Sequence, residues 1–256
     1  MGRASFITEG IKLKEHLFRE SDVSLLIFTE SRGTIRAIAP GLKRSKKRFP
    51  GSIRKLCLYE FSLTAGKKDY YVVSGARFLQ AFEEIAHNFK AYCAADYILQ
   101  VIQYFYLENM ASSYIYQSLR IFLESLASGK DIISTVKWME IRVLADSGFL
   151  SNVTTCSRCA RVFREEEKGY YNRENSHIYC INCRIAGKYI IISKDMRGKV
   201  AAALDPECGE FTPFPEHESG SINRITTEVI LEKLGFVPRP LIQITRDLKL
   251  KGLKTL

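Results

Sequence analysis

The first 75 residues alternate between apolar and polar positions in short runs, the pattern of β-strands with one buried face. The first run places apolar side chains on one side and lysines on the other: Ile7, Ile11 and Leu13 against Lys12 and Lys14. Runs at 25–29 and 34–39 flank the turn Ser31-Arg32-Gly33, where the glycine favours the left-handed backbone that a hairpin turn needs. The pattern therefore predicts an N-terminal β-domain.

Two further runs, 56–63 and 70–73, bring the expected number of strands to about five. Five short antiparallel strands in about 75 residues suit a small, partly open barrel. The oligonucleotide-binding (OB) fold is the nucleic-acid-binding example of such a barrel. A small barrel with a different function is the alternative.

From Phe78 the spacing of apolar residues changes to the period of about 3.6 that amphipathic helices show. Three helical stripes follow: Tyr97, Val101, Tyr104 and Phe105; Leu119, Phe122, Leu123 and Leu126; Ile132, Val136, Met139 and Val143. We expect these stripes to pack against one another as the core of a helical bundle.

The helical pattern stops after Gly148, and a polar, cysteine-containing segment occupies about 152–188. Helical patterns return at 195–204 and 222–234, on either side of a turn-rich stretch at 205–221 that contains prolines. The cysteine segment is therefore expected as an insertion within the helical part of the chain.

Two pairs of cysteines are the strongest local signal: Cys156 and Cys159 in CSRC, then Cys180 and Cys183 in CINC. Two residues between thiolates allow one turn of backbone to aim both sulfurs at a single point, and two such turns complete a tetrahedron around Zn²⁺. The intervening 20 residues lie within the usual range for a zinc ribbon. The sequence therefore predicts one structural zinc ion held by these four residues.

Other roles for the cysteines are weaker. A redox pair needs only one such motif, disulfides are disfavoured in a reducing cytosol, and a catalytic zinc keeps one position open. A zinc deaminase has proline before its Cys-x-x-Cys, where this chain has Tyr179. His177 could replace a cysteine as a ligand, but its spacing from Cys180 is more typical of a surface side chain.

The expected fold class is α+β, with a five-stranded OB-fold barrel followed by a helical bundle that carries a four-cysteine zinc ribbon. The expected domains are an OB-fold DNA-binding domain at 1–77 and a helical domain at 78–256, with the ribbon inserted at about 152–188.

Composition describes an ordinary globular protein, with 256 residues of which 46% are apolar and 26% charged. The chain has no run of roughly 18 apolar residues, as a membrane span requires, and its N-terminus lacks the apolar segment of a secretory signal. We expect a cytoplasmic protein without a membrane partner.

The net charge of +10 is concentrated near the N-terminus, because residues 1–75 carry 15 basic and 7 acidic side chains. A local excess of this kind favours a polyanionic partner, either nucleic acid or an anionic membrane surface. The alternative is that the charge serves solubility alone.

A basic loop at 42–49 (LKRSKKRF) holds five cations in six positions: Lys43, Arg44, Lys46, Lys47 and Arg48. It follows Pro40-Gly41 and is expected to project from between the third and fourth strands without a packed partner. A run of like charges is often merely solvated, but its place in the positive domain favours phosphate contact. The same basic face is expected to include Lys12, Arg32 and Arg36, with Lys14.

Motifs typical of enzymes are missing from the sequence. It has no phosphate loop, no dinucleotide-binding glycine motif and no nucleophile turn of the Gly-x-Ser-x-Gly type. The 4 histidines are widely spread. A binding protein is therefore favoured over an enzyme.

Residues 10–49 resemble the bacterial RecO family of recombination mediators. The similarity rests on the turn Arg19-Glu20-Ser21-Asp22, the strand end Phe28-Thr29, the turn glycine Gly33 and the basic stretch from Gly41 to Arg48. The order of strands, helical bundle and inserted four-cysteine site also matches that family along nearly the whole chain.

The resemblance implies an N-terminal OB fold and a C-terminal helical domain with a zinc ribbon. It further implies binding to single- and double-stranded DNA, annealing of complementary strands, and cooperation with RecR in loading RecA onto DNA coated by single-strand-binding protein (SSB), in the cytoplasm at the nucleoid. Carried over by residue, the DNA contacts fall on Arg36, Lys43, Arg44, Lys46, Lys47 and Arg48.

Two other classes of protein stay open on the sequence alone. One is a zinc-ribbon RNA-binding or transcription factor without annealing activity. The other is a hydrolase with catalytic carboxylates that no motif marks; it would need an open cation site, which four thiolates do not provide.

Overall fold

A computed structural model describes residues 5–45, 47–49, 51–66, 70–108, 110–150, 152–205 and 219–245. The chain forms two compact units, Met1–Ser128 and Gly129–Leu256, which are described separately below. None of the helices in these ranges combines the length and the apolar character that a membrane crossing needs.

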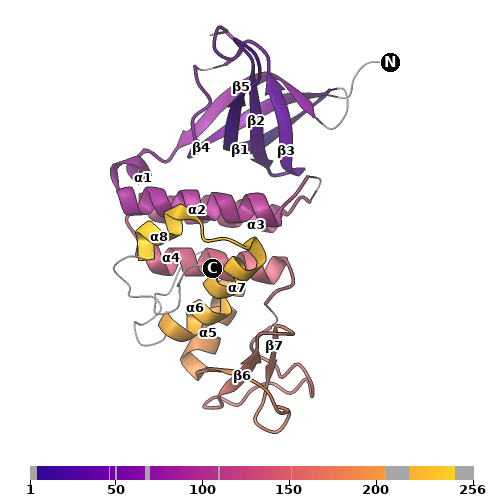
Figure 1. The fold of residues 1–256 in the computed structure, drawn as a ribbon, viewed down its shortest axis with the longest axis vertical. Coiled ribbons are helices and arrows are strands. Elements are labelled where there is room, and N and C mark those ends of the chain that lie inside the picture. Colours follow the sequence, from indigo (N-terminus) through magenta and orange to yellow (C-terminus); the bar gives the residue numbers. More distant parts are fainter. Residues whose placement is uncertain are drawn as a thin grey trace. The chain divides into compact units, whose positions relative to one another are not determined.

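Five strands open the first unit: β1 (Ser5–Leu17), β2 (Val23–Thr29), β3 (Gly33–Ala39), β4 (Cys57–Ala65) and β5 (Tyr71–Ala81). They pair in the order β1-β2-β3-β5-β4, and β4 pairs with β1 (Figure 1). The sheet therefore closes on itself, whereas the sequence suggested a partly open barrel. The parallel seam between β3 and β5 is short, with Ala37 opposite Tyr71 and Ile38 opposite Val72.

Alternate residues of the strands fill the barrel. Its core comes mainly from β2, β3 and β4: Val23, Leu25, Ile27, Ile35, Ala37, Ala39, Cys57, Tyr59, Phe61 and Leu63. The hairpin between β2 and β3 turns at Gly33 with φ +66°, as the sequence predicts. Gly33 is favoured there because a side chain would be strained at this φ and would meet the backbone of Met110.

Strand β1 departs from the simple alternation that its sequence suggests. Phe6 packs against the barrel core, so its neighbour Ile7 points outward and is 65% exposed. A register shift follows, since Lys12 is opposite Ile27 and Lys14 is opposite Leu26. This bulge leaves one extra residue in β1. Side chains that alternate between the inside and the outside of the barrel therefore change sides at the bulge. The prediction that Ile7 lies on the buried side is wrong.

Helices α1 (Glu83–His87), α2 (Phe89–Phe105) and α3 (Ser113–Ala127) complete the first unit (Figure 1). Asn88 and Ser112 cap α2 and α3 by accepting hydrogen bonds from backbone N–H groups in the first turn. Phe28, on the outside of β2, packs against the rings of Tyr106 and Tyr116 at centroid distances of 5.9 and 6.0 Å. The helices therefore bury one outer side of the barrel.

Most of the predicted helical stripes are buried, but two details differ. Tyr104 is 46% exposed instead of lying in a core. Phe78 belongs to β5, which continues to Ala81, so the helical part starts later than predicted.

Helices α4 (Ile132–Asp146), α5 (Lys194–Leu204), α6 (Ser219–Ile225), α7 (Thr227–Leu234) and α8 (Arg239–Thr245) form the helical part of the second unit. The sequence predicts α4 and α5, and it predicts a single helix at 222–234 where the structure has α6 and α7, divided at Thr226; α8 was not predicted. The prolines of the turn-rich stretch, Pro206, Pro213 and Pro215, lie outside the described residues.

Buried polar groups connect the helices of this unit. Lys137 and Glu140 on α4 form a buried ion pair at 2.8 Å, and the Thr227 hydroxyl at the start of α7 donates to Glu140. Arg142 donates to the carbonyl oxygens of Ala203 and Asp205 at 2.8 and 2.7 Å. These contacts join α4 to α7 and to the end of α5.

Candidate metal centre and nucleic-acid interface

The ribbon in the second unit brings the four predicted cysteines together. The Sγ atoms of Cys156, Cys159, Cys180 and Cys183 all lie within 4.8 Å of one another. Four sulfurs bound to one zinc at about 2.3 Å would be separated by about 3.8 Å. The donor set therefore fits a single tetrahedral ion, as the spacing predicts.

Tight backbone turns hold the sulfurs at this spacing. In the first pair, the Ala160 N–H donates to the Cys156 carbonyl at 2.9 Å; in the second, the Arg184 N–H donates to the Cys180 carbonyl at 3.2 Å. The Cys180 N–H also points at the Cys156 sulfur, 3.4 Å away, which links the two turns.

The surroundings of two sulfurs favour thiolates. Burial alone would raise the pKa of Cys156, but hydrogen bonds from the backbone N–H groups of Cys159, Cys180 and Arg158 outweigh it and lower the pKa to about 6. Burial alone would also raise the pKa of Cys180, but hydrogen bonds from the Arg161 guanidinium, Cys183 and the Asn182 N–H together lower it.

The pKa of Cys183 is raised to about 12 by its hydrogen bonds with the Cys180 and Cys159 sulfurs. Sulfurs this close resist ionising together unless a cation shares their charge. Four thiolates around a divalent ion leave a net negative charge, and the Arg161 guanidinium, which also pairs with Glu167, hydrogen-bonds to Cys180. The arrangement is that of a metal site with no open position.

Among the described residues, the two other cysteines lie outside the cluster. Cys57 and Cys93 are buried in the first unit, and burial raises both of their pKa values. Cys208 lies outside the described residues. His177, considered above as a possible ligand, hydrogen-bonds through its ring to Tyr179 at 3.5 Å.

The basic loop lies between β3 and β4, as predicted, but it is anchored to the barrel. Leu42 and Phe49, at its two ends, are buried in the barrel core. The Gly41 N–H donates to the Asp22 carboxylate at 2.9 Å, and the Lys43 N–H donates to the Ser21 carbonyl. The loop therefore lies against the turn between β1 and β2, and its two ends are fixed in the barrel core.

Lys43, Arg44, Lys47 and Arg48 are exposed. Arg44 meets Glu20 at 3.7 Å, a contact between two highly exposed groups that neutralises little charge. Arg48 donates to the Pro40 carbonyl at 2.7 Å, so it also shapes the loop. Lys46 lies outside the described residues.

The outer face of β1, β2 and β3 continues the positive surface. Lys14, Leu26 and Arg36 form one cross-strand row, and both cations are exposed. Arg32 lies at the opposite end of β3 from the basic loop. The rise per residue of an extended strand puts these two ends about 20 Å apart. Its guanidinium lies 4.5 Å from the centre of the Phe6 ring. These cations therefore follow β3 instead of forming one cluster.

Lys12 does not belong to this surface, contrary to the sequence-based expectation. Its side chain is turned into the barrel and is only 6% exposed. The ammonium donates to the Glu15 carboxylate at 2.6 Å and to the Ile53 carbonyl oxygen. The bulge in β1 explains the error, because it places Lys12 and Lys14 on opposite sides of the barrel wall.

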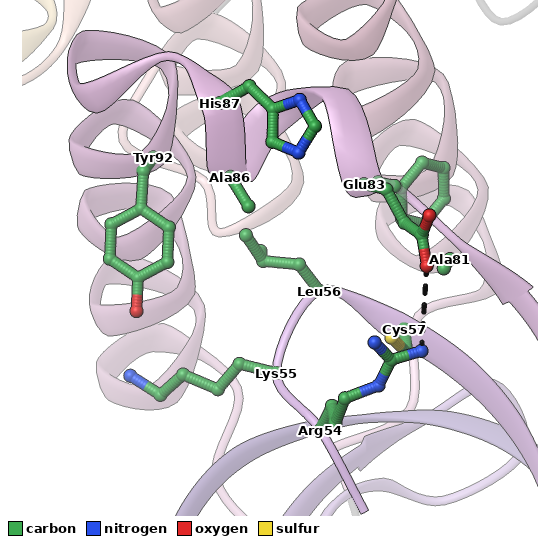
Figure 2. A pocket seen from close by; sticks show the side chains of 10 residues that line it. Arg54, Lys55, Leu56, Cys57, Ala81, Glu83, Ala86, His87 and Tyr92 are labelled. Atoms are coloured by element: carbon green, nitrogen blue, oxygen red, sulfur yellow. Dashed lines mark ion pairs between the residues drawn. The ribbon is translucent and has the colours of Figure 1, made fainter.

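A pocket of about 270 Å³ in the first unit had no counterpart in the sequence analysis. Figure 2 shows Lys55, Tyr92 and His87 around Leu56, with Arg54 facing Glu83. Both cations have acidic partners, because Arg54 meets Glu83 at 3.7 Å and Lys55 meets Asp96 at 2.8 Å. Two cations and two carboxylates therefore lie together here, so the net charge of the pocket is lower than that of the basic loop.

Comparison with known families covers both parts of the chain. The family model described as "Recombination protein O N terminal" matches residues 1–82, and "Recombination protein O C terminal" matches residues 86–236. The chain belongs to the RecO family. Membership in this family supports a role in DNA repair and recombination, and with it DNA binding.

Individual relatives agree with the RecO assignment. The chain is 28% identical over 179 residues to the DNA repair protein RecO of Dehalococcoides mccartyi strain CBDB1, which covers 70% of each chain. It is 28% identical over 178 residues to RecO of Thermoanaerobacter sp. strain X514, covering 69% of this chain and 70% of the relative. RecO of Desulforudis audaxviator is 32% identical over 152 residues, which cover 59% of this chain and 60% of the relative.

Proposed function

We propose that this RecO-family protein binds single- and double-stranded DNA through the basic face of its barrel and anneals complementary strands. With RecR, it helps to load RecA onto single-stranded DNA coated by SSB, and its contact with RecA is indirect. It makes and breaks no covalent bonds. Its place of action is the cytoplasm, at the nucleoid.

The observation that carries this proposal is the fixed, exposed set of cations on the barrel. Lys43, Arg44 and Lys47 project from a loop with buried ends, and Arg36 and Arg32 extend the positive charge along β3. An OB barrel uses the face of its second and third strands to bind oligonucleotides. The proposed DNA contacts are therefore Arg32, Arg36 and the basic loop, including Lys46, with Lys14 in place of Lys12.

Annealing follows from electrostatics. Two complementary strands repel each other through their phosphates, and a shared cationic surface lowers that repulsion. The sequence match is then tested by base pairing and not by the protein. This mechanism needs no catalytic side chain.

We propose Zn²⁺ as the ion of the four-cysteine cluster because four thiolates at tetrahedral spacing are its typical structural site. The ion would hold the ribbon in its fold and supply no reaction. A DNA-binding domain at 1–77 and a helical domain at 78–256, with the ribbon at about 152–188, remain part of this proposal.

Strand annealing by the purified protein tests the function. A loop variant (Lys43→Gln, Arg44→Gln and Lys47→Gln) should anneal complementary oligonucleotides at least about tenfold more slowly than the wild type. A control variant (Lys90→Gln, Lys130→Gln and Arg239→Gln) loses the same charge at exposed positions elsewhere and should anneal normally.

Adding RecR and SSB tests the mediator role, since the protein should then speed RecA loading onto SSB-coated strands. Structured RNA serves as the competing ligand. Preference for that RNA over single-stranded DNA, without annealing, would indicate an RNA-binding factor instead.

A further inference from the structure

The ribbon sheet carries aromatic side chains on its solvent face. It consists of β6 (Gly169–Asn172), β7 (His177–Tyr179) and β8 (Ile190–Ile192), in the order β7-β6-β8. Tyr170 on β6 is opposite Tyr179 on β7 and Ile191 on β8, so these three side chains share a face. Ile191 is 54% exposed. The other face is buried, with Tyr171 between Ile178 and Ile190.

Four rings on this side form a continuous series, which we call the aromatic row: His177, Tyr179, Tyr189 and Tyr170. Successive centroids are 6.3, 6.2 and 6.3 Å apart, and successive planes meet at 79°, 84° and 88°. Hydrogen bonds fix two of the rings. The Tyr189 hydroxyl donates to the Ile185 carbonyl at 2.9 Å, and Asn175 donates to the Tyr179 hydroxyl at 2.8 Å. The row is therefore pre-positioned.

Free positive charge surrounds the aromatic row. The Arg184 guanidinium lies 4.7 Å from the centre of the Tyr170 ring, and the exposed Lys188 precedes Tyr189. Neither cation has a carboxylate partner among the described residues. The acidic side chains of the ribbon other than Glu174 are engaged elsewhere: Glu165 and Glu166 with Lys194, and Glu167 with Arg161.

We infer that the aromatic row is a second nucleic-acid contact, which stacks bases of single-stranded DNA while Arg184 and Lys188 meet the phosphates. Unpaired bases expose aromatic faces at every nucleotide, and each carries one phosphate, so a ligand of this kind matches rings interleaved with cations. Bases in a duplex are already stacked and cannot use the row. The contact therefore favours single strands, and it rests on the proposed DNA-binding function.

The direct test separates bases from phosphates. Anisotropy titrations compare an oligo-dT strand with an abasic strand of the same length, which keeps the phosphates and lacks the bases. The wild type should bind oligo-dT at least about fivefold more tightly, since stacking on one ring is worth at least that factor. A double variant, Tyr170→Leu and Tyr179→Leu, should lose this preference, whereas Tyr170→Phe and Tyr179→Phe should keep it.

Zinc content provides the folding control, because a ribbon that retains one ion per chain has kept its shape. If the leucine variant loses the ion, Arg184→Gln with Lys188→Gln is used, which leaves the rings in place. That pair should weaken binding to oligo-dT and flatten its salt dependence by about 1.4 in log–log slope.

An unchanged preference for oligo-dT in a zinc-loaded leucine variant would overturn the inference, as would an unchanged salt slope in the Arg184 and Lys188 variant. Failure of the wider DNA-binding proposal is distinguishable from either result. It would appear as a loop variant of the barrel that binds all strands as tightly as the wild type.

Discussion

Lys12 and Lys14 are two residues apart on β1, yet their side chains lie on opposite sides of the barrel wall. Lys12 is opposite Ile27 of the core, and Lys14 is opposite Leu26 on the outer face. In a regular strand they would share a face. The bulge between them therefore assigns one lysine to the fold and the other to the surface.

This difference predicts separable effects of two equal substitutions. Lys12→Met should destabilise the protein by about 1–3 kcal/mol, because the Ile53 carbonyl oxygen loses its buried donor. Lys14→Met should change stability by less than about 0.5 kcal/mol but weaken DNA binding. Thermal unfolding and anisotropy titrations measure the two effects. Equal loss of stability in both variants would show that the bulge does not separate their roles.

The buried pair Lys137 and Glu140 gives a second prediction. Glu140→Leu leaves the Lys137 ammonium buried without its carboxylate and should cost about 3–5 kcal/mol. Replacing both, Lys137→Met with Glu140→Leu, should recover most of that loss, because a paired charge can be exchanged for apolar groups of similar size. The thermal midpoint reports both changes. A double variant no more stable than the single one would contradict this explanation.

The metal site should be sensitive to acid. A thiol whose folded-state pKa is depressed stabilises the fold at high pH. For Cys156 this contribution is complete above the ordinary value of 9.0 and is lost as the pH falls through about 6. Protonated thiols do not bind zinc, so the ion should also be released as the pH falls.

A colorimetric chelator measures this release as the pH is lowered. Cys156→Ser should release the ion at higher pH than the wild type. Cys93→Ser removes a buried thiol outside the cluster and should release it at the wild-type pH. Identical release curves for wild type and Cys156→Ser would exclude Cys156 as a ligand.

Periodicity and spacing were sufficient to predict much of the fold. Strands β2 and β3 have a regular alternation and a turn glycine, and the cysteine spacing identified four sulfurs that the structure places within 4.8 Å. Both signals are local, so they do not depend on how distant parts of the chain pack.

The features that sequence reasoning missed depend on register or on context. The bulge in β1 has no residue signature, so Lys12 was placed on the wrong side. Helix α8 is 7 residues long, too short for its period to stand out. The aromatic row needed the pairing of β6 with β7, because Tyr170 and Tyr179 are neighbours only across strands. A pair of tyrosines at 170–171 gave no indication of which ring faced solvent.

The salt dependence of DNA binding tests the central claim most directly. Each cation that neutralises a single-strand phosphate contributes about −0.7 to the slope of log K against log salt. The loop variant, which lacks Lys43, Arg44 and Lys47, should therefore show a slope on oligo-dT that is shallower than the wild type by about 2. The control variant with Lys90, Lys130 and Arg239 replaced should keep the wild-type slope. Equal slopes for the loop variant and the wild type would contradict the claim that these cations bind DNA.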